Sequence, residues 1–252
     1  MEADAAARAL KDAEKKARDK GEDDDTVAQK SDDAAQNALV APKAQRNFTD
    51  PDARIMKTAD GSFHYAYNAQ ALVDADQQVI VATTLTNIGV DVEQVVPMVE
   101  QLHATMGALP GEILMDAGYC SAANLDYART VETATGGRTE FFIATGRVKH
   151  GERVPEVPRG RIPATATLRE RMARKLKTKK GRAVYARRKA IVEPVFGQIH
   201  TRQGKYVLLR GVEQAAHEWD LMAACHNLMK LHTMQTKAIL AVQAGLTARP
   251  AT

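Results

Sequence analysis

The 252-residue sequence is poor in cysteine, tryptophan and long apolar runs. Its two cysteines, Cys120 and Cys225, are too few for a disulfide framework and lack the paired spacing of a zinc site. No apolar run approaches the roughly 18 residues that a membrane helix requires. The opening MEADAAARALKDAEKK has no apolar core of the kind that a secretory signal needs. We therefore expect a cytoplasmic protein with no structural metal.

Charge is abundant but unevenly placed. Hydrophobic residues make up 44% of the sequence and charged residues 26%, which is typical of a globular chain of one domain, with or without an appendage. Residues 1–50 carry nine Lys/Arg and twelve Asp/Glu, whereas residues 147–210 carry nineteen Lys/Arg and four Asp/Glu. The second segment therefore has a net charge of +15. Such a density of cations attracts polyanions, and nucleic acid is the commonest of these in a cell; the alternative is a solvated basic loop.

Three segments can be distinguished along the chain. Residues 1–47 are mostly Ala, Asp, Lys and Glu, so we expect an acidic tail that is disordered or loosely helical over 5–20. The acids of GEDDD at 21–25 are interpreted as a solvated linker. Residues 48–233 form the folded domain, and 234–252 are expected to be a frayed helix and tail.

The folded domain begins with a β pattern and continues as an α/β alternation. Residues 63–86 read as one hairpin with a turn at 74–78. Asp91 is expected to cap a helix that ends near Gly107. A strand over 113–115, a helix over 121–131 and a strand over 140–144 follow. A later helix, around 221–231 and preceded by Trp219, is expected to pack on the sheet through residues listed here: Leu221, Met222, Cys225, Leu228, Met229 and Leu231.

Two acids stand out in this pattern. Asp116 directly follows a short apolar strand, and the carboxyl edge of a sheet is where α/β folds place their sites; a turn or capping aspartate is the alternative. Glu193 lies within an apolar helical stretch over 183–200, where a buried carboxylate would need a cation or metal to compensate it. Pro194 is expected to kink that helix or to start a new one.

Several short strings, in their order and spacing, resemble the carboxyl-terminal half of a bacterial insertion-sequence transposase of the DDE type. These strings are YNAQ at 67–70, DAGY at 116–119, VEPVFG at 192–197, LRG at 209–211 and EW at 218–219. The resemblance covers roughly residues 48–233. It implies a ribonuclease H-like mixed sheet flanked by helices, with Asp116 as the second catalytic acid and Glu193 as the final one.

The resemblance also implies a cofactor and a substrate. Both acids would bind Mg²⁺, or Mn²⁺ as a substitute, for two-metal cleavage and joining of DNA phosphodiesters. Tyr185 and Arg188 resemble the family's accessory Tyr and Arg. The family's usual spacing is shorter by one residue and points instead to Ala186 and Lys189, and His200 stands where a lysine is common. The remaining predicted DNA contacts are Arg171, Arg174, Lys175 and Arg202, as phosphate ligands.

The first catalytic acid of the family has no evident counterpart. It lies on a strand before the hairpin, but residues 1–62 hold only the brief stretch 54–57 with any β character. Asp60, Asp74 and Asp76 are available acids at turn-like positions. We therefore expect a sheet that is incomplete at the N-terminal side, and a truncated transposase or one half of an interrupted reading frame.

Two functions remain open at this point. The first is an enzyme or enzyme fragment that binds transposon ends and target DNA, and whose missing part is supplied by self-association or a second chain. The second is a catalytically inactive DNA-binding or regulatory remnant. A nuclease without a role in transposition fits the strings at 192–197 and 209–211 less well.

Overall fold

The computed structural model describes residues 24–37, 47–58, 61–146 and 160–243, together with seven separate residues between 6 and 17. The chain divides into two compact units, Met1–Pro51 and Asp52–Thr252. In the first unit, helix α2 spans Asp24–Gln36. The expectation of a solvated linker at 21–25 is therefore wrong for Asp24 and Asp25. These acids occupy the first turn of α2, where the positive end of the helix dipole favours them. The loose helix expected at 5–20 lies largely outside the described residues.

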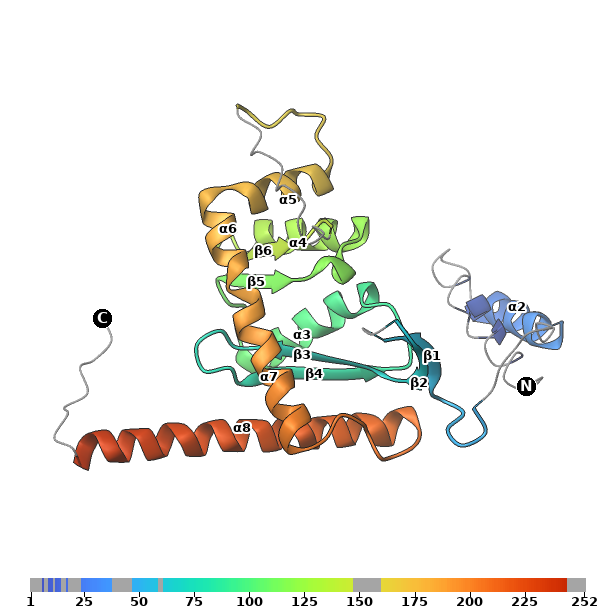
Figure 1. Ribbon diagram of the computed structural model, residues 1–252. Coiled ribbons are helices and arrows are strands. Elements are labelled where there is room, and N and C mark those ends of the chain that lie inside the picture. The colour runs from blue at the N-terminus through green and yellow to red at the C-terminus, as the bar shows by residue number, and fades with distance from the viewer. Residues whose placement is uncertain are drawn as a thin grey trace. The chain divides into compact units, whose positions relative to one another are not determined.

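The second unit is a mixed α/β fold whose strands form three separate pairs (Figure 1). Strand β1 (Arg54–Lys57) pairs antiparallel with β2 (Phe63–Ala66), and β3 (Asn68–Val73) pairs antiparallel with β4 (Ile80–Thr86). Strands β5 (Glu112–Met115) and β6 (Glu140–Ile143) are parallel. The single hairpin predicted over 63–86 is thus two hairpins, because the chain changes partner at Tyr67. The brief stretch at 54–57 is a strand, but it pairs only with β2.

Helices between β4 and β6 follow the predicted pattern closely. A short 3₁₀ turn, η1 (Val92–Gln94), leads into α3 (Val95–Met106), which ends at Gly107 in the left-handed conformation. After β5 come the 3₁₀ turn η2 (Ala117–Tyr119) and α4 (Ala122–Ala134), whose N-cap Ser121 accepts a hydrogen bond from the Asn124 amide. The core around β5 and β6 buries Phe141 and Ile143 against the apolar faces of α3 and α4.

Three helices make up most of the described part of the basic segment. Helices α5 (Leu168–Lys177), α6 (Lys179–Ala186) and α7 (Arg188–Arg202) follow one another with short breaks. The break before α7 falls at Arg187, and α7 runs on through Pro194, so the expectation that a new helix starts at Pro194 is wrong. Proline removes the hydrogen bond that would satisfy Ala190 O. The side-chain amide of Gln78 donates to that oxygen instead, at 2.9 Å.

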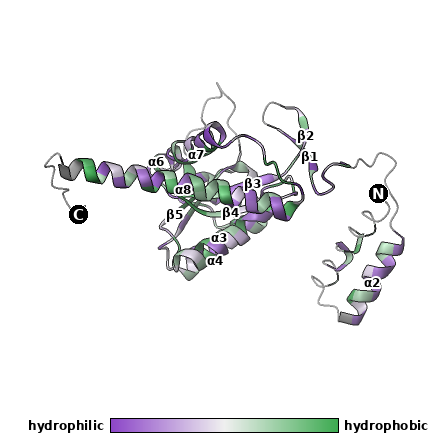
Figure 2. Ribbon diagram, turned by 90° about the horizontal axis from the view of Figure 1, so that it is seen from below, coloured by the Kyte–Doolittle hydropathy of each residue, from purple (hydrophilic) through white to green (hydrophobic). Residues whose placement is uncertain are grey.

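Helix α8 (Val212–Gln243) closes the unit across β4 (Figure 1). The helix continues to Gln243 and so extends into the segment expected to be a frayed helix and tail. The expected packing face is confirmed for Trp219 and Met222 but is wrong for the leucines, since Leu221 and Leu228 are 63% and 65% exposed. Ala215 and Ala223 also pack on the sheet. Figure 2 shows apolar and polar residues mixed along the whole of α8. No helix in the described ranges is long and apolar enough to span a bilayer.

Candidate active site at the end of strand β5

Asp116 stands where the apolar strand β5 ends and η2 begins. Its Oδ1 accepts a hydrogen bond from the backbone amide of Gly118 at 2.8 Å. The capping role considered as an alternative is therefore real, but it uses only this one oxygen in the described contacts. An aspartate with one oxygen held by the backbone is a carboxylate in a fixed orientation at the carboxyl end of a strand.

A second carboxylate, Asp91, lies beside Asp116 across Gly118. A Cβ on Gly118 would come within 2.6 Å of Asp91 Oδ2 and 3.0 Å of Asp116 Oδ1. Real Cβ atoms do not tolerate such an approach to a carboxylate, so only glycine fits between the two acids. Asp91 occupies the predicted N-cap position before Val92, but its side chain makes no cap hydrogen bond.

Amide side chains of β3 hold Asp91 in place. Asp91 Oδ1 accepts from Asn68 Nδ2 at 2.8 Å and from Gln70 Nε2 at 2.9 Å. Sequence reasoning missed Asp91 as a site residue. A signal was present, since Asn68 and Gln70 are polar residues two apart on one face of a strand. What the sequence did not reveal is the acid that they face.

Gln70 links this pair of acids to the core. Its side chain is 5% exposed, and its Oε1 accepts a hydrogen bond from the Tyr119 hydroxyl. Its backbone oxygen accepts from Trp219 Nε1 at 2.9 Å. Burial, followed by the charges of Asp91 and Asp116, raises the pKa of Tyr119 well above its ordinary value of 10.0. Tyr119 therefore stays a neutral hydrogen-bond donor.

Helices α6 and α7 bring Tyr185 and Arg188 to the same place. Burial raises the pKa of Tyr185; the Arg188 guanidinium opposes this shift, and the Asp116 carboxylate adds to it. The centre of the guanidinium lies 5.9 Å from the centroid of the Tyr185 ring. Arg188 Nε is buried and has no hydrogen-bond partner among the described residues. Two of the accessory residues predicted from the sequence thus lie close to Asp116.

Glu193 lies on a different face of α7. The buried face consists of Ile191, Val195 and Ile199, and a residue two positions from Ile191 points away from it. Glu193 is therefore exposed, and the expectation that it is buried in the apolar stripe is wrong. Its exposed stripe continues through residues spaced three or four apart, namely Lys189, Gly197 and His200. No described hydrogen bond or ion pair joins Glu193 to Asp116.

The predicted cations divide into two groups. Arg171 donates to the carbonyls of Pro163, Ala164 and Ala166, and Arg174 to that of Gly160. Lys175 binds Glu132 at 2.7 Å and Glu140 at 3.4 Å. These three side chains thus make intramolecular contacts, and their role as phosphate ligands stays a prediction. Lys189, His200 and Arg202 are exposed.

Two of the three acids considered as substitutes for the first catalytic acid, Asp74 and Asp76, lie in the turn between β3 and β4. Asp60 lies outside the described residues. Asp74 accepts hydrogen bonds from the amides of Asp76 and Gln77 and so closes the turn between β3 and β4. Asp76 is exposed in that turn.

The carboxylates at the end of β5 provide some, but not all, of the ligands that a hard divalent cation needs. Asp91 and Asp116 offer adjacent carboxylate oxygens, which are the ligands that Mg²⁺ prefers. Within the described ranges, however, no group of three or more His, Cys, Asp or Glu side chains could hold a metal ion. The geometry therefore supplies a pair of acids and no third ligand.

Comparison with known proteins gives one family. The family model described as "Transposase DDE domain" matches residues 41–228, about three quarters of the chain. No curated protein and no solved structure matches. The matched range contains Asp91, Asp116 and Glu193, together with the helices that carry the exposed cations.

Proposed function

Because the chain belongs to the transposase DDE domain family, we propose that it binds DNA and contributes part of a phosphodiester cleavage and strand-transfer site in transposition. The observation that carries this proposal is the pair of carboxylates at the end of β5, with Arg188 and Tyr185 beside Asp116. Cleavage and joining of DNA require hard oxygen ligands and cations in one place. The fold that accommodates them is proposed to be ribonuclease H-like.

Asp116 and its neighbour Asp91 would hold Mg²⁺, or Mn²⁺, in this site, and Glu193, as the counterpart of the family's final acid, would add a ligand from α7. When bound, such an ion supplies Lewis-acid activation of the attacking oxygen and stabilisation of the leaving oxygen. Asp116 contributes a carboxylate whose orientation is fixed by the Gly118 amide. Arg188 contributes a cation beside it. Neutral Tyr119 holds Gln70, and Gln70 in turn orients Asp91.

DNA is proposed to lie along the exposed side of α7 and the loop that follows it. Lys189, His200, Arg202, Lys205 and Arg210 are all exposed there. Phosphate contacts of this kind release counterions and carry no sequence information. The exposed Tyr206, 78% accessible between Lys205 and the apolar Leu208, offers a ring for stacking on an unpaired base.

A salt titration tests the proposed DNA surface. We expect affinity for a duplex to fall steeply between 50 and 200 mM salt, on the order of tenfold or more. Replacing Lys189, Arg202 and Lys205 by Gln together should reduce the slope, with similar losses for transposon-end and scrambled duplexes. The matched control replaces Arg171, Arg174 and Lys175, which should lower stability more than DNA affinity. Affinity that ignores salt would refute the proposal.

Metal titration and strand cleavage separate an active site from an inactive remnant. We expect Asp116→Ala to abolish Mg²⁺ binding measured by calorimetry, and Glu193→Ala to weaken it. Because the described acids supply no third ligand, binding should be weak and cleavage of matched ends by the isolated chain slow. DNA binding without any metal response would favour the second candidate, an inactive DNA-binding protein. Identical metal titrations for wild type and both variants would remove these acids from the site.

A further inference from the structure

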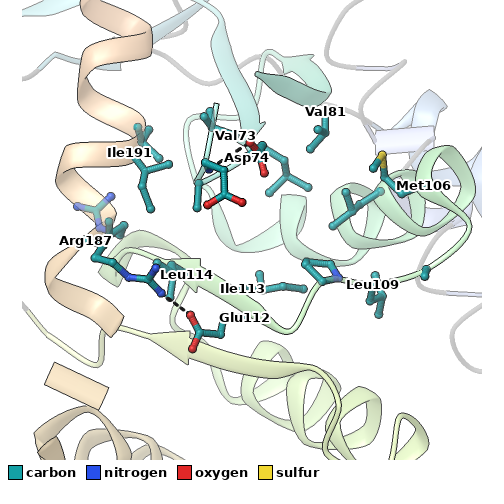
Figure 3. A pocket seen from close by; sticks show the side chains of 18 residues that line it. Val73, Asp74, Val81, Met106, Leu109, Glu112, Ile113, Leu114, Arg187 and Ile191 are labelled. Atoms are coloured by element: carbon teal, nitrogen blue, oxygen red, sulfur yellow. Dashed lines mark hydrogen bonds and ion pairs between the residues drawn. The ribbon is translucent and has the colours of Figure 1, made fainter. Parts of the chain in front are cut away.

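Exposed apolar side chains gather on the loop between α7 and α8, residues 203–211 (Figure 1). Leu208 is 83% exposed and Leu209 is 50% exposed. A cavity of about 470 Å³ between the β3–β4 hairpin and the β5–β6 pair is also lined by apolar side chains (Figure 3). Arg188 lines that cavity, which therefore adjoins the candidate active site. The α7–α8 loop is a separate surface and needs its own explanation.

Contacts with α8 fix the shape of this loop. Both carboxylate oxygens of Glu218 accept hydrogen bonds from loop amides: Leu208 N donates to Oε1 at 2.9 Å and to Oε2 at 2.8 Å, and Leu209 N donates to Oε2 at 2.7 Å. Val207, the residue before them, packs against the core cluster that contains Trp219. The loop is thus anchored through one side chain and two backbone amides, and it holds the two leucine side chains at the surface.

A fixed loop that exposes leucine is typical of a binding surface. The hydrogen bonds from Glu218 restrict backbone that would otherwise sample many conformations. Such preorganisation lowers the cost of binding, because the loop does not have to become ordered when its partner arrives. The Leu208 side chain contributes little to the free protein, since most of its surface stays in water. The partner therefore supplies the apolar contact that Leu208 lacks.

Charge around the loop indicates the chemistry of this partner. Lys205 and Arg210 lie before and after the leucines in the chain, and both are exposed. Residues 194–212 include His, Lys and Arg but no Asp or Glu. A surface that combines leucine with flanking cations suits the minor groove of duplex DNA. Proteins that bind there insert apolar side chains between base pairs and hold the phosphates with Lys and Arg.

We propose that the α7–α8 loop inserts Leu208 between two base pairs from the minor groove of duplex DNA and so bends the duplex. Lys205 and Arg210 bind phosphates on either side of the inserted side chain. Glu218 is a positioning residue, because it holds the loop in the shape that insertion requires. Insertion unstacks one base step, so binding favours steps that open easily, such as TA. This inference rests on the proposed function, since it requires that the chain binds DNA.

DNA bending by the full chain tests this inference. The probe is a duplex of about 30 base pairs with one central TA step and with donor and acceptor dyes on its two ends. Energy transfer between the dyes reports the bend. We expect saturating protein to raise the transfer by the amount that a bend of about 20–90° produces. A duplex with AT in place of the central TA has the same composition and charge but a stiffer step, so it should bind about fivefold more weakly.

Two pairs of variants separate the inserted side chain from its support. Leu208→Ala should lose the bend and the preference for TA but keep salt-dependent binding, whereas Leu228→Ala, which removes a 65% exposed leucine from α8, should change neither. Glu218→Ala should also lose the bend. Its control, Glu213→Ala, removes one acid from the same helix and should leave the bend intact. Glu218→Gln, which keeps one accepting oxygen, should restore part of the bend. Thermal unfolding verifies that each variant is folded.

The outcomes distinguish this inference from the proposed function. Binding of both duplexes without a rise in energy transfer would overturn the inference and leave the proposed DNA binding intact. The absence of binding to either duplex would overturn both. A bend that persists in Leu208→Ala would also overturn the inference, and the exposed leucines would then be assigned to an apolar protein partner. An equal loss of the bend in Glu213→Ala and Glu218→Ala would remove the positioning role from Glu218.

Discussion

Gln78 is predicted to stabilise helix α7 at the one place where its backbone hydrogen bonding is interrupted. Pro194 has no N–H for Ala190 O, and Gln78 Nε2 donates to this oxygen at 2.9 Å. The Gln78 side chain also accepts from Lys230 Nζ at 2.8 Å. Removing it in Gln78→Ala deletes both hydrogen bonds. We expect the free energy of unfolding to fall by about 1–2 kcal/mol, the sum of two partly exposed hydrogen bonds.

Gln78→Ala should lower the free energy of unfolding by less when Pro194 has been replaced. In Pro194→Ala the new N–H at position 194 can donate to Ala190 O, so this oxygen no longer depends on Gln78. Gln78→Ala should therefore cost about 1 kcal/mol less in the Pro194→Ala background, a coupling of the size that neighbouring groups show. For a chain of this size, 1 kcal/mol corresponds to roughly 2–4 °C in Tm.

Urea and thermal unfolding of the four proteins of this cycle measure the coupling. Gln77→Ala is the matched control, because Gln77 is exposed in the same turn and only its backbone amide makes a described hydrogen bond. Gln77→Ala should leave the free energy of unfolding nearly unchanged, both with Pro194 and with Ala at position 194. An equal cost of Gln78→Ala with and without Pro194 would refute the reasoning, since it would show that Gln78 does not substitute for the missing backbone donor.

Three further predictions concern the site and its supports. Gly118→Ala should weaken Mg²⁺ binding in calorimetry far more than Gly111→Ala, because the new Cβ meets two carboxylates at 2.6 and 3.0 Å in the first case and one carbonyl at 3.7 Å in the second. Tyr119 has a raised pKa in the folded state, so its contribution to stability should decline as pH rises above the unfolded value of 10.0; Tyr119→Phe should flatten that alkaline loss in denaturation curves. Lys175→Met should lower stability by about 1 kcal/mol and leave DNA affinity unchanged, since Lys175 is paired with Glu132 and Glu140; a clear loss of DNA affinity would return this lysine to the DNA surface.

Local chemistry explains what was predictable in this fold. The strand ending at Asp116, the Ser121 cap of α4 and the Gly107 end of α3 each depend on residues adjacent in the chain. The spacing of hydrophobic residues and the presence of capping residues therefore predict where these strands and helices begin and end. The family resemblance also followed from short strings, which the family match over 41–228 confirms.

Contacts between distant segments explain what was not predictable. Asp91 was expected to cap a helix, but amides 21 and 23 residues earlier bind it instead. Pro194 was expected to break α7, but a side chain more than a hundred residues away satisfies the freed carbonyl. The packing face of α8 falls on Trp219, Met222 and Ala223, whereas Leu221 and Leu228 are exposed.

The sequence by itself determined the elements, the family and the two acids that the resemblance singled out. Only the tertiary structure decided which groups surround each of them. Helical periodicity predicts that one face of α7 is buried, but only packing in three dimensions decides that Arg188 lies beside Tyr185 while Glu193 is exposed. Likewise a sequence lists strands without their partners, because pairing depends on backbone edges that meet only after folding. That is why the second acid beside Asp116 became visible only in three dimensions.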